Sequence, residues 1–323
     1  MVGVYRMHKS GGPEVMQWEE EELPPPDGQM VLVRHVAIGL NYIDTYHRSG
    51  LYPLPLPSRL GVEAAGLVEA VGSDVTTLQP GDRVAYAGGL GAYAEANLLP
   101  AGRLVKLPEG VSEEVAAASL LKGLTTCYLL RRTFPVTKNH TILVHAAAGG
   151  VGLLLCQWAK HIGATVIGTV GTAEKAELAS QNGADHTIIY RGEDVVARVR
   201  EITDGKGVNV SYDSVGKDTY QISLDCLAPL GMFVSFGNSS GNAPPIDPHE
   251  LQNRGSLFFT RPSLAHYTAS TEDLGNLADE FFAAIADGIV KVHINQRYPL
   301  TELVQAHRDL ESRMTTGSTV ILP

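Results

Sequence analysis

A glycine-rich turn at residues 145–152 carries the residue types and spacing that point most directly to chemistry. Its sequence is His-Ala-Ala-Ala-Gly-Gly-Val-Gly; it follows a predicted strand (141–145) and leads into a predicted helix (151–162). Glycines let a backbone approach a pyrophosphate, and a helix N-terminus presents free N–H groups and the positive end of its dipole. We therefore predict that a dinucleotide binds at Gly149, Gly150, Val151 and Gly152.

The turn departs from the usual GxGxxG pattern, which would place its first glycine where Ala147 stands. A glycine-rich turn by itself is weak evidence for a dinucleotide, because such connections also occur in other α/β proteins. The strand, helix and second strand around this turn are arranged as in a nucleotide-binding βαβ unit, and this context favours the dinucleotide.

Residues near the end of the second predicted strand (165–170) favour NADPH over NADH. Folds that bind NADH place an acid there to bond the ribose 2′-hydroxyl, and this strand is followed by none. Lys175 would attract a 2′-phosphate, although a solvated helix residue is the alternative interpretation. Tyr190, beside Arg191, could lay its ring against the adenine ribose. The NADPH contacts predicted here are Gly171, Thr172, Lys175 and Tyr190.

Two patterns of elements divide the chain. Roughly the first 110 residues contain short β-rich runs punctuated by Pro and Gly, such as 30–38 and 65–72, as in a β-barrel-like domain. Strands then alternate with helices of about ten residues, which predicts a parallel sheet covered on both faces. After Pro262 a short tail, too small to fold alone, should pack back onto the N-terminal part. The sheet strands predicted are 141–145, 165–170, 187–190, 208–213, 231–237 and 256–260.

Composition excludes several classes of protein. The 323 residues carry a formal net charge of −10, which argues against nucleic acid as a partner. Three scattered cysteines form no CxxC pair, so neither a disulfide framework nor a thiolate zinc site is indicated. The first residues lack an apolar signal core, and no apolar run reaches the roughly 18 residues of a membrane span. We expect a cytoplasmic protein with no membrane partner.

Further motifs are distributed over nearly the whole chain: residues 37–46, 48–53, 61–66, 81–84, 121–125, 145–152, 212–216, 236–241 and 260–264. Together they resemble the quinone oxidoreductases (NADPH:quinone reductases, zeta-crystallin-like) of the medium-chain dehydrogenase/reductase superfamily. The resemblance implies a GroES-like β-barrel catalytic domain (1–121), a Rossmann-type, doubly wound NADPH-binding domain (122–263) and a C-terminal segment (264–323) packed on the catalytic domain. It also implies a homodimer, and the strand at 256–260 would be a sheet edge.

A zinc site is not expected. Zinc-dependent alcohol dehydrogenases of this superfamily have a Cys ligand where Asn41 stands and a His ligand in a Gly-His-Glu triplet, which here is Gly61-Val62-Glu63. Valine cannot ligate a metal, and three cysteines cannot form a four-Cys site. Alcohol oxidation needs a Lewis acid to stabilise an alkoxide, whereas a quinone is already electrophilic.

The resemblance implies roles for single residues as well. Asn41 and Tyr46 should approach the nicotinamide, and Tyr52 the entrance of a substrate pocket between the domains; packing within a loop is the alternative for the tyrosines and the interpretation adopted for Tyr42. Asp44 is expected to orient its neighbours rather than to transfer protons. Cofactor loops follow the carboxyl ends of parallel strands. Further cofactor contacts implied are Thr125, Tyr128, Ser214, Phe236, Gly237, Asn238, Ser239, Phe259, Thr260, Arg261 and Arg313.

The function that these observations favour is zinc-independent, NADPH-dependent reduction of quinones, by transfer of either a hydride or an electron from the nicotinamide to a quinone in the cleft between the domains. An NADPH-dependent alkenal or enone reductase is the first alternative, because the same hydride could reach an activated C=C bond. A cofactor-binding protein without catalysis, or an RNA-binding protein, is the second, although the net charge weighs against RNA.

Overall fold

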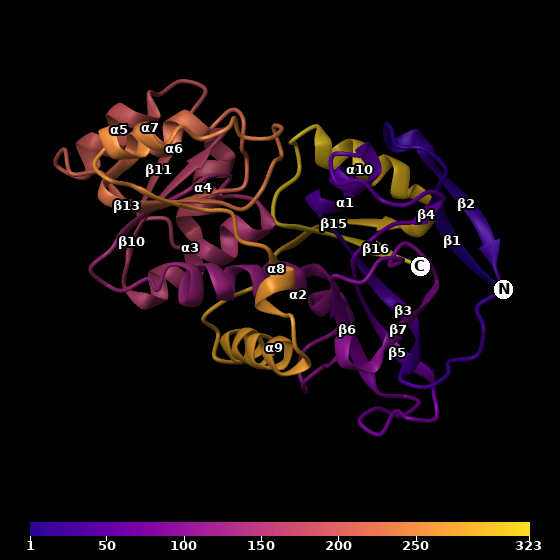
Figure 1. Ribbon diagram of the computed structural model, residues 1–323. Coiled ribbons are helices and arrows are strands. Elements are labelled where there is room, and N and C mark those ends of the chain that lie inside the picture. Colours follow the sequence, from indigo (N-terminus) through magenta and orange to yellow (C-terminus); the bar gives the residue numbers. More distant parts are fainter. The chain divides into compact units, whose positions relative to one another are not determined.

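The structure is a computed structural model that describes residues 1–323, and the chain divides into two units (Figure 1). The first unit comprises Met1–Leu124, Thr268–Ala286 and Val292–Pro323, and the second comprises Thr125–Tyr267 and Asp287–Lys291. Helix α2 (Glu113–Tyr128) carries the chain from one to the other. No helix combines the length and the apolar character that a membrane span requires.

Six parallel strands form the centre of the second unit, in the order β11-β10-β9-β12-β13-β14. Ile142, Leu143 and Val144 of β9 are all fully buried, as expected for a strand covered on both faces. The sheet strands are β9 (Thr141–Val144), β10 (Thr165–Val170), β11 (His186–Ile189), β12 (Val208–Asp213), β13 (Leu227–Ser235) and β14 (Phe258–Thr260). The helices are α3 (Gly150–Ile162), α4 (Ala173–Gln181), α5 (Val195–Ile202), α6 (Tyr220–Cys226), α7 (Pro248–Asn253) and α8 (Leu264–Tyr267).

This unit confirms the predicted α/β fold with a parallel sheet, and the ends of several elements differ from the predicted ranges. Strand β13 begins at Leu227, earlier than predicted. Strand β14 begins only at Phe258, because Ser256 takes a left-handed backbone with φ of 58°. Helix α2 ends at Tyr128 and continues as a wider π turn (Leu129–Thr133).

The first unit contains a seven-stranded sheet of order β15-β16-β3-β5-β6-β8, with β7 also paired to β3. The C-terminal strand β16 pairs antiparallel with β3, so the end of the chain completes a sheet begun near its start. The strands are β3 (Met30–Leu40), β5 (Glu63–Val71), β6 (Arg83–Ala87), β7 (Ala96–Pro100), β8 (Val105–Lys106), β15 (Ile294–Pro299) and β16 (Ser318–Leu322). The helices are α1 (Tyr42–Ser49), α9 (Thr271–Ala286) and α10 (Leu303–Glu311).

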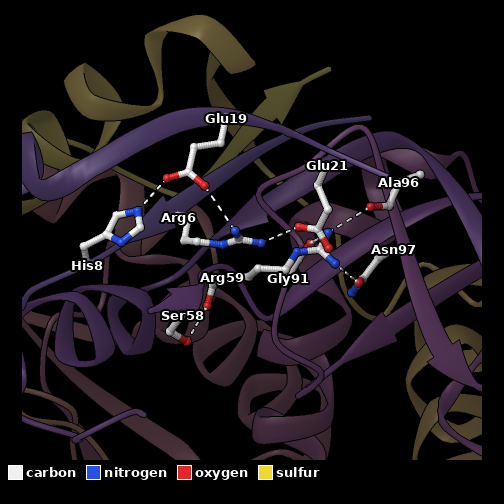
Figure 2. Close-up of polar contacts among 9 residues, drawn as sticks. All are labelled: Arg6, His8, Glu19, Glu21, Ser58, Arg59, Gly91, Ala96 and Asn97. Carbon is white, nitrogen blue, oxygen red and sulfur yellow. Dashed lines mark hydrogen bonds and ion pairs between the residues drawn. The ribbon is translucent and has the colours of Figure 1, made fainter. Parts of the chain in front are cut away.

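A small sheet of order β2-β1-β4, which the sequence analysis did not predict, also belongs to the first unit. It is formed by β1 (Val2–Met7), β2 (Met16–Glu21) and β4 (Ser58–Arg59). Figure 2 shows ion pairs on this sheet: the Arg6 guanidinium contacts both Glu19 and Glu21, and His8 contacts Glu19 at 2.6 Å. These cross-strand pairs lie partly in solvent.

Candidate functional site

The glycine-rich turn has the geometry of a phosphate-binding loop. Gly149 is the N-cap of α3, no side chain caps that helix, and its first N–H groups therefore lack an intrahelical partner. A Cβ on Gly152 would lie 2.3 Å from the carbonyl oxygen of Ala146, so only glycine fits there. Ala146 itself takes φ of 53°, which sharpens the turn. The predicted residues Gly149, Gly150, Val151 and Gly152 thus lie together at the start of α3.

Ala147, the departure from the usual pattern, is accommodated by a second glycine. Its side chain is fully buried, and its N–H donates to the Thr169 carbonyl at 3.1 Å. A Cβ on Gly168 of β10 would lie 2.7 Å from the Ala147 methyl group. The methyl group of Ala147 therefore occupies the space that a side chain at position 168 would need.

His145, next to the turn, has a structural position. It is buried, its Nδ1 lies 2.9 Å from the Thr169 hydroxyl, and its Nε2 lies 3.1 Å from the Ser223 hydroxyl. Ser223 in turn donates to the buried carboxylate of Asp213 at 2.8 Å. Burial lowers the pKa of His145, which favours the neutral ring. The residue joins β9 to β10 and α6 and is not placed to act on a ligand.

Lys175 and Tyr190 lie where the ends of β10 and β11 meet. A Cβ on Gly171 would lie 2.8 Å from the Tyr190 hydroxyl and 3.7 Å from Arg191 Nε, so these groups gather over the glycine. Thr172 is the N-cap of α4 and accepts the Lys175 N–H at 3.3 Å. Burial, and then the Arg191 charge, lower the pKa of Lys175. The two cations are close enough to repel each other, which an anion between them would relieve.

The loops after β12, β13 and β14 are bonded to one another at the same edge of the sheet. The Gly237 position is so close to Ser214 that a Cβ would lie 2.3 Å from the Ser214 carbonyl oxygen. The Ser239 N–H also donates to that oxygen. Arg261 donates to the Ser235 carbonyl at 2.8 Å and thereby ties the end of β14 to β13. The structure thus groups the predicted residues Ser214, Phe236, Gly237, Asn238, Ser239, Thr260 and Arg261.

Other predicted cofactor residues have evident packing contacts. The Tyr128 ring is 3% exposed and stacks on Tyr267 with centroids 4.3 Å apart. Thr125 hydrogen-bonds Tyr128, and burial raises the pKa of that tyrosine. The Phe259 ring lies against Phe233 of the core. Arg313 follows α10 in the first unit, is exposed, and has φ of 61°. Their cofactor contacts stay predictions.

Asn41, Tyr46 and Tyr52 belong to the first unit and lie on or beside a helix rather than in a loop. Asn41 is the N-cap of α1, and its N–H donates to the Asp44 carboxylate at 2.9 Å. Tyr46 is 8% exposed and meets Tyr52 edge-on with centroids 5.2 Å apart. Tyr42 donates its hydroxyl to the Leu310 carbonyl. The segment after β3 is a helix and not the loop expected there, because Asn41 and Asp44 together cap it, while Tyr42 packs against the core as predicted.

Ionisable side chains from three separate segments meet beside Asn41. The Asn41 amide donates to Glu63 Oε2 at 2.7 Å, and the Lys122 ammonium lies 3.4 Å from the same oxygen. Asp44 and Glu63 are both fully buried. Burial raises the pKa of Asp44 to about 7, and burial also raises the pKa of Glu63, which Lys122 partly offsets. The cluster places one cation and two carboxyl groups at a predicted substrate residue.

A hydrogen-bonded chain connects this cluster to α10. The Tyr93 hydroxyl donates to Asp44 at 2.7 Å and lies 3.0 Å from His307 Nε2. His307 Nδ1 accepts from Arg48, which is 2% exposed and paired with Glu311. Burial, and then the Arg48 charge, lower the pKa of His307 to about 3. Because Arg48 donates to Nδ1, the neutral ring carries its proton on Nε2.

The donor set around Asn41 does not suit zinc. Val62 is buried and has no ligating atom, and the amide nitrogen of Asn41 is engaged with Glu63. No group of three or more His, Cys, Asp or Glu side chains in the structure could hold a metal ion.

The sequence analysis assigned no role to Glu63, Lys122 or Tyr93. A signal for one of them was present: Lys122 is the single charged residue between Glu114 and Arg131, within a strongly apolar helical stretch. Glu63 and Tyr93 gave no comparable signal, since Glu63 lies 59 positions from Lys122 and Tyr93 lies 49 positions from Asp44.

Two family models match the chain. The model described as an alcohol dehydrogenase GroES-like domain matches residues 27–109, and the model described as a zinc-binding dehydrogenase matches residues 150–283. The second match does not include Asn41 or Val62, the positions that decide whether zinc could bind.

Individual proteins match over nearly the full length. A quinone oxidoreductase of Pseudomonas aeruginosa is 56% identical over 315 residues, covering 97% of each chain. A 2-haloacrylate reductase of a Burkholderia species is 46% identical, covering 100% of this chain and 99% of its own. The crystal structure of Escherichia coli quinone oxidoreductase complexed with NADPH is 51% identical, with a TM-score of 0.97 and coverage of 99% of this chain and 100% of that one.

Proposed function

Because the chain belongs to the quinone oxidoreductase family of the medium-chain dehydrogenase/reductase superfamily, we propose that it reduces quinones with NADPH and without zinc. The observation that carries the proposal is the full-length likeness to a quinone oxidoreductase whose structure contains NADPH. The residues of this chain fit that cofactor in two respects: a phosphate-binding turn and a pair of cations.

The chain's own residues would hold NADPH along the carboxyl edge of the parallel sheet. The N–H groups at the start of α3 would bind the pyrophosphate, where the missing side chain of Gly152 keeps the turn tight. Lys175 and Arg191 would bind the 2′-phosphate beside Tyr190. When bound, the cofactor supplies a hydride. The loops at Ser214, Gly237 and Arg261 would orient its nicotinamide half.

On the acceptor side, Asn41 is fixed rather than mobile. Its backbone is held by Asp44 and its amide by Glu63, so the side chain presents one orientation. The partly exposed ring of Tyr52, which packs edge-on against buried Tyr46, would offer aromatic surface to a flat quinone. Asn41 and Val62 stand where a zinc-dependent relative would have a cysteine and a histidine. The acceptor must therefore be electrophilic without the help of a metal.

The proposal is tested by NADPH oxidation with 1,4-benzoquinone and 9,10-phenanthrenequinone after treatment with a chelator. We expect turnover with at least one of them, with NADPH preferred to NADH. Tight NADPH binding without turnover of either quinone would overturn the proposal and favour a non-catalytic binding protein.

An enone reductase is the second candidate, and the likeness to the 2-haloacrylate reductase favours it, because the name of that protein denotes a substrate with an activated C=C bond. The two candidates are separated by measuring kcat/KM with quinones and with unsaturated aldehydes and acids in parallel. A higher kcat/KM for the C=C substrates would replace the first proposal by the second.

We also propose a homodimer and a cytoplasmic location. Strand β14 is the edge of the parallel sheet, and Phe258 on it is 55% exposed, so a second copy would cover unpaired backbone and apolar surface. The three cysteines are buried and form no disulfide, which suits a reducing compartment. Light scattering and cell fractionation test the two statements separately.

A further inference from the structure

Lys122 is a buried cation with a loose ion pair. Its side chain is only 8% exposed, and its ammonium lies 3.4 Å from Glu63 Oε2. Charge-assisted N–H···O contacts are usually 2.7–2.9 Å long. The carboxylate of Glu63 has two closer donors, the Leu121 N–H at 2.6 Å and the Asn41 amide at 2.7 Å. Two neutral N–H groups therefore fix the Glu63 carboxylate, and the carboxylate in turn attracts the ammonium of Lys122.

The local structure makes room for this arrangement. A Cβ on Gly39 would lie 2.3 Å from Glu63 Oε2 and 2.1 Å from the Ala117 carbonyl oxygen of α2. Strand β3 therefore approaches α2 closely at a residue without a side chain, and the Glu63 carboxylate lies against that gap. A buried ion pair is often no more stabilising than apolar residues of similar volume.

Lys122 is also next to the acceptor-side residue Asn41, because their nitrogens contact the same oxygen of Glu63. The other ionisable group nearby, Asp44, is fully buried and bonded to Tyr93 and to the Asn41 backbone. Lys122 is thus the cation of this cluster and, unlike the two carboxyl groups, retains some exposed surface.

We propose that Lys122 is a catalytic residue that donates the proton to the quinone oxygen during reduction, with Glu63 as the positioning residue that holds its ammonium beside Asn41. The inference rests on the proposed function, taken as a hydride transfer. Two electrons and one hydrogen pass from the cofactor to the quinone, which leaves the hydroquinone with one oxyanion. A proton moves from Lys122 Nζ to that oxygen and completes the hydroquinone, and the neutral amine then takes a proton from solvent.

The chemistry of the partners agrees with this role. An ammonium carries N–H protons that it can donate, and the oxyanion of a reduced quinone is a base that accepts one. An ammonium also stabilises the negative charge as it develops, in a place where a metal enzyme would use a Lewis acid.

The first test measures how the effect of Lys122→Met depends on the quinone. With trimethyl-1,4-benzoquinone, whose reduced oxyanion is a strong base, we expect kcat/KM to fall about 100-fold, within the usual range for a general acid. With tetrachloro-1,4-benzoquinone, whose oxyanion needs no proton, we expect a loss of less than about 5-fold. An equal loss with both quinones would show a merely structural role, and no loss with either would overturn the assignment.

Two further variants guard against misfolding. Lys122→Arg keeps the positive charge, but its guanidinium does not give up a proton, so we expect normal folding and NADPH affinity with the same loss of turnover. The double variant Lys122→Met/Glu63→Gln removes the charge pair together and should fold where Lys122→Met does not. Lys106→Met, which removes a surface lysine paired with Asp82, is the matched control and should retain wild-type turnover.

The second test needs neither cofactor nor turnover. Titration of 4-nitrophenol by its absorbance, with and without protein, reports whether the bound phenol ionises more readily. We expect wild type and Lys122→Arg to lower its apparent pKa and Lys122→Met to leave it unchanged. No shift with wild type, or equal shifts with all three, would overturn the inference.

The tests separate the two levels of the account. Wild-type protein that oxidises no NADPH with any quinone would refute the proposed function. Normal wild-type turnover together with an undiminished Lys122→Met variant would refute the role of Lys122 alone.

Discussion

The cofactor edge of the second unit and the polar cluster of the first unit are built in contrasting ways. At the cofactor edge, the close approaches at Gly152, Gly168 and Gly237 are approaches to backbone or to a methyl group, so the geometry depends on absent side chains. In the cluster, the geometry depends on the buried ionisable groups of Asp44, Glu63 and Lys122. The comparison teaches that one region should respond to added volume and the other to changes of charge and pH.

The largest effect is expected from pH acting on Asp44. Its pKa is raised to about 7 by burial, so between its usual value near 4 and pH 7 the folded state binds a proton that the unfolded state has lost. The free energy of unfolding therefore falls as pH rises through this window. The groups that face Asp44 are Tyr93, Glu63 and Lys122. Between pH 5 and pH 8 we expect the free energy of unfolding of wild type to fall by about 3 kcal/mol more than that of Asp44→Asn.

Denaturant unfolding of both proteins at several pH values measures this difference. The comparison with the variant is needed because His307, with a pKa lowered to about 3, acts in the opposite direction. In the unfolded protein His307 takes up a proton at a higher pH than in the folded protein. Its contribution to the free energy of unfolding is therefore lost as pH falls below about 6.5. Parallel pH profiles of wild type and Asp44→Asn would contradict the raised pKa of Asp44.

Volume added at the cofactor edge should produce the next largest effect. In Gly152→Ala the new methyl group would overlap the Ala146 carbonyl, and the turn must open. We expect the Kd for NADPH to rise about 100-fold, equivalent to about 3 kcal/mol, as measured by nucleotide fluorescence. Gly275→Ala is the matched control, since a Cβ there meets nothing within 4 Å and the residue lies inside α9. It should leave binding unchanged and raise the free energy of unfolding by about 0.5–1 kcal/mol.

Lys175→Ala should have a smaller effect that depends on the cofactor. Loss of one of two cations at the proposed 2′-phosphate site should raise the Kd for NADPH about 10-fold and leave that for NADH unchanged. The exposed lysine at position 206, Lys206→Ala, serves as the control. Equal weakening of both cofactors would show that Lys175 supports the fold of α4 instead.

The smallest effect is expected at the surface ion pairs of β1 and β2 (Figure 2). Arg6 is 26% exposed on its side chain and contacts two partly exposed glutamates. Arg6→Gln should lower the free energy of unfolding by less than about 1 kcal/mol, and less at high salt. A larger loss would mean that even exposed charges of the first unit carry much of its stability.

The contrast also explains what could be predicted from the sequence. The parallel sheet and its turn follow from local patterns, since strand runs, the caps of α3 and α4 and the glycines all lie within short segments. The polar cluster could not be predicted in this way, because Glu63 meets Asn41 and Lys122 only after β3, β5 and α2 have packed together. The helix α1 was missed for a related reason: Asn41 and Asp44 were considered for chemistry and not for capping.

The small sheet of β1, β2 and β4 escaped prediction for another reason. Strand β2 contains a run of glutamates, which on local propensity disfavours a strand. Pairing with β1 overrides that preference, because Arg6, which lies opposite Gln17, reaches Glu19 and Glu21 on the same face and balances their charge. Local propensity therefore identified strands and helices only where they form without a pairing partner from a distant part of the sequence.

A single-turnover experiment tests the central claim most directly. Chelator-treated protein of verified zinc content, loaded with NADPH, is mixed rapidly with 1,4-benzoquinone while nicotinamide absorbance and hydroquinone formation are followed together. The account predicts one hydroquinone formed per NADPH oxidised, at a rate that added zinc does not raise. NADPH that stays reduced in the complex, or oxidation that appears only after zinc is restored, would contradict it.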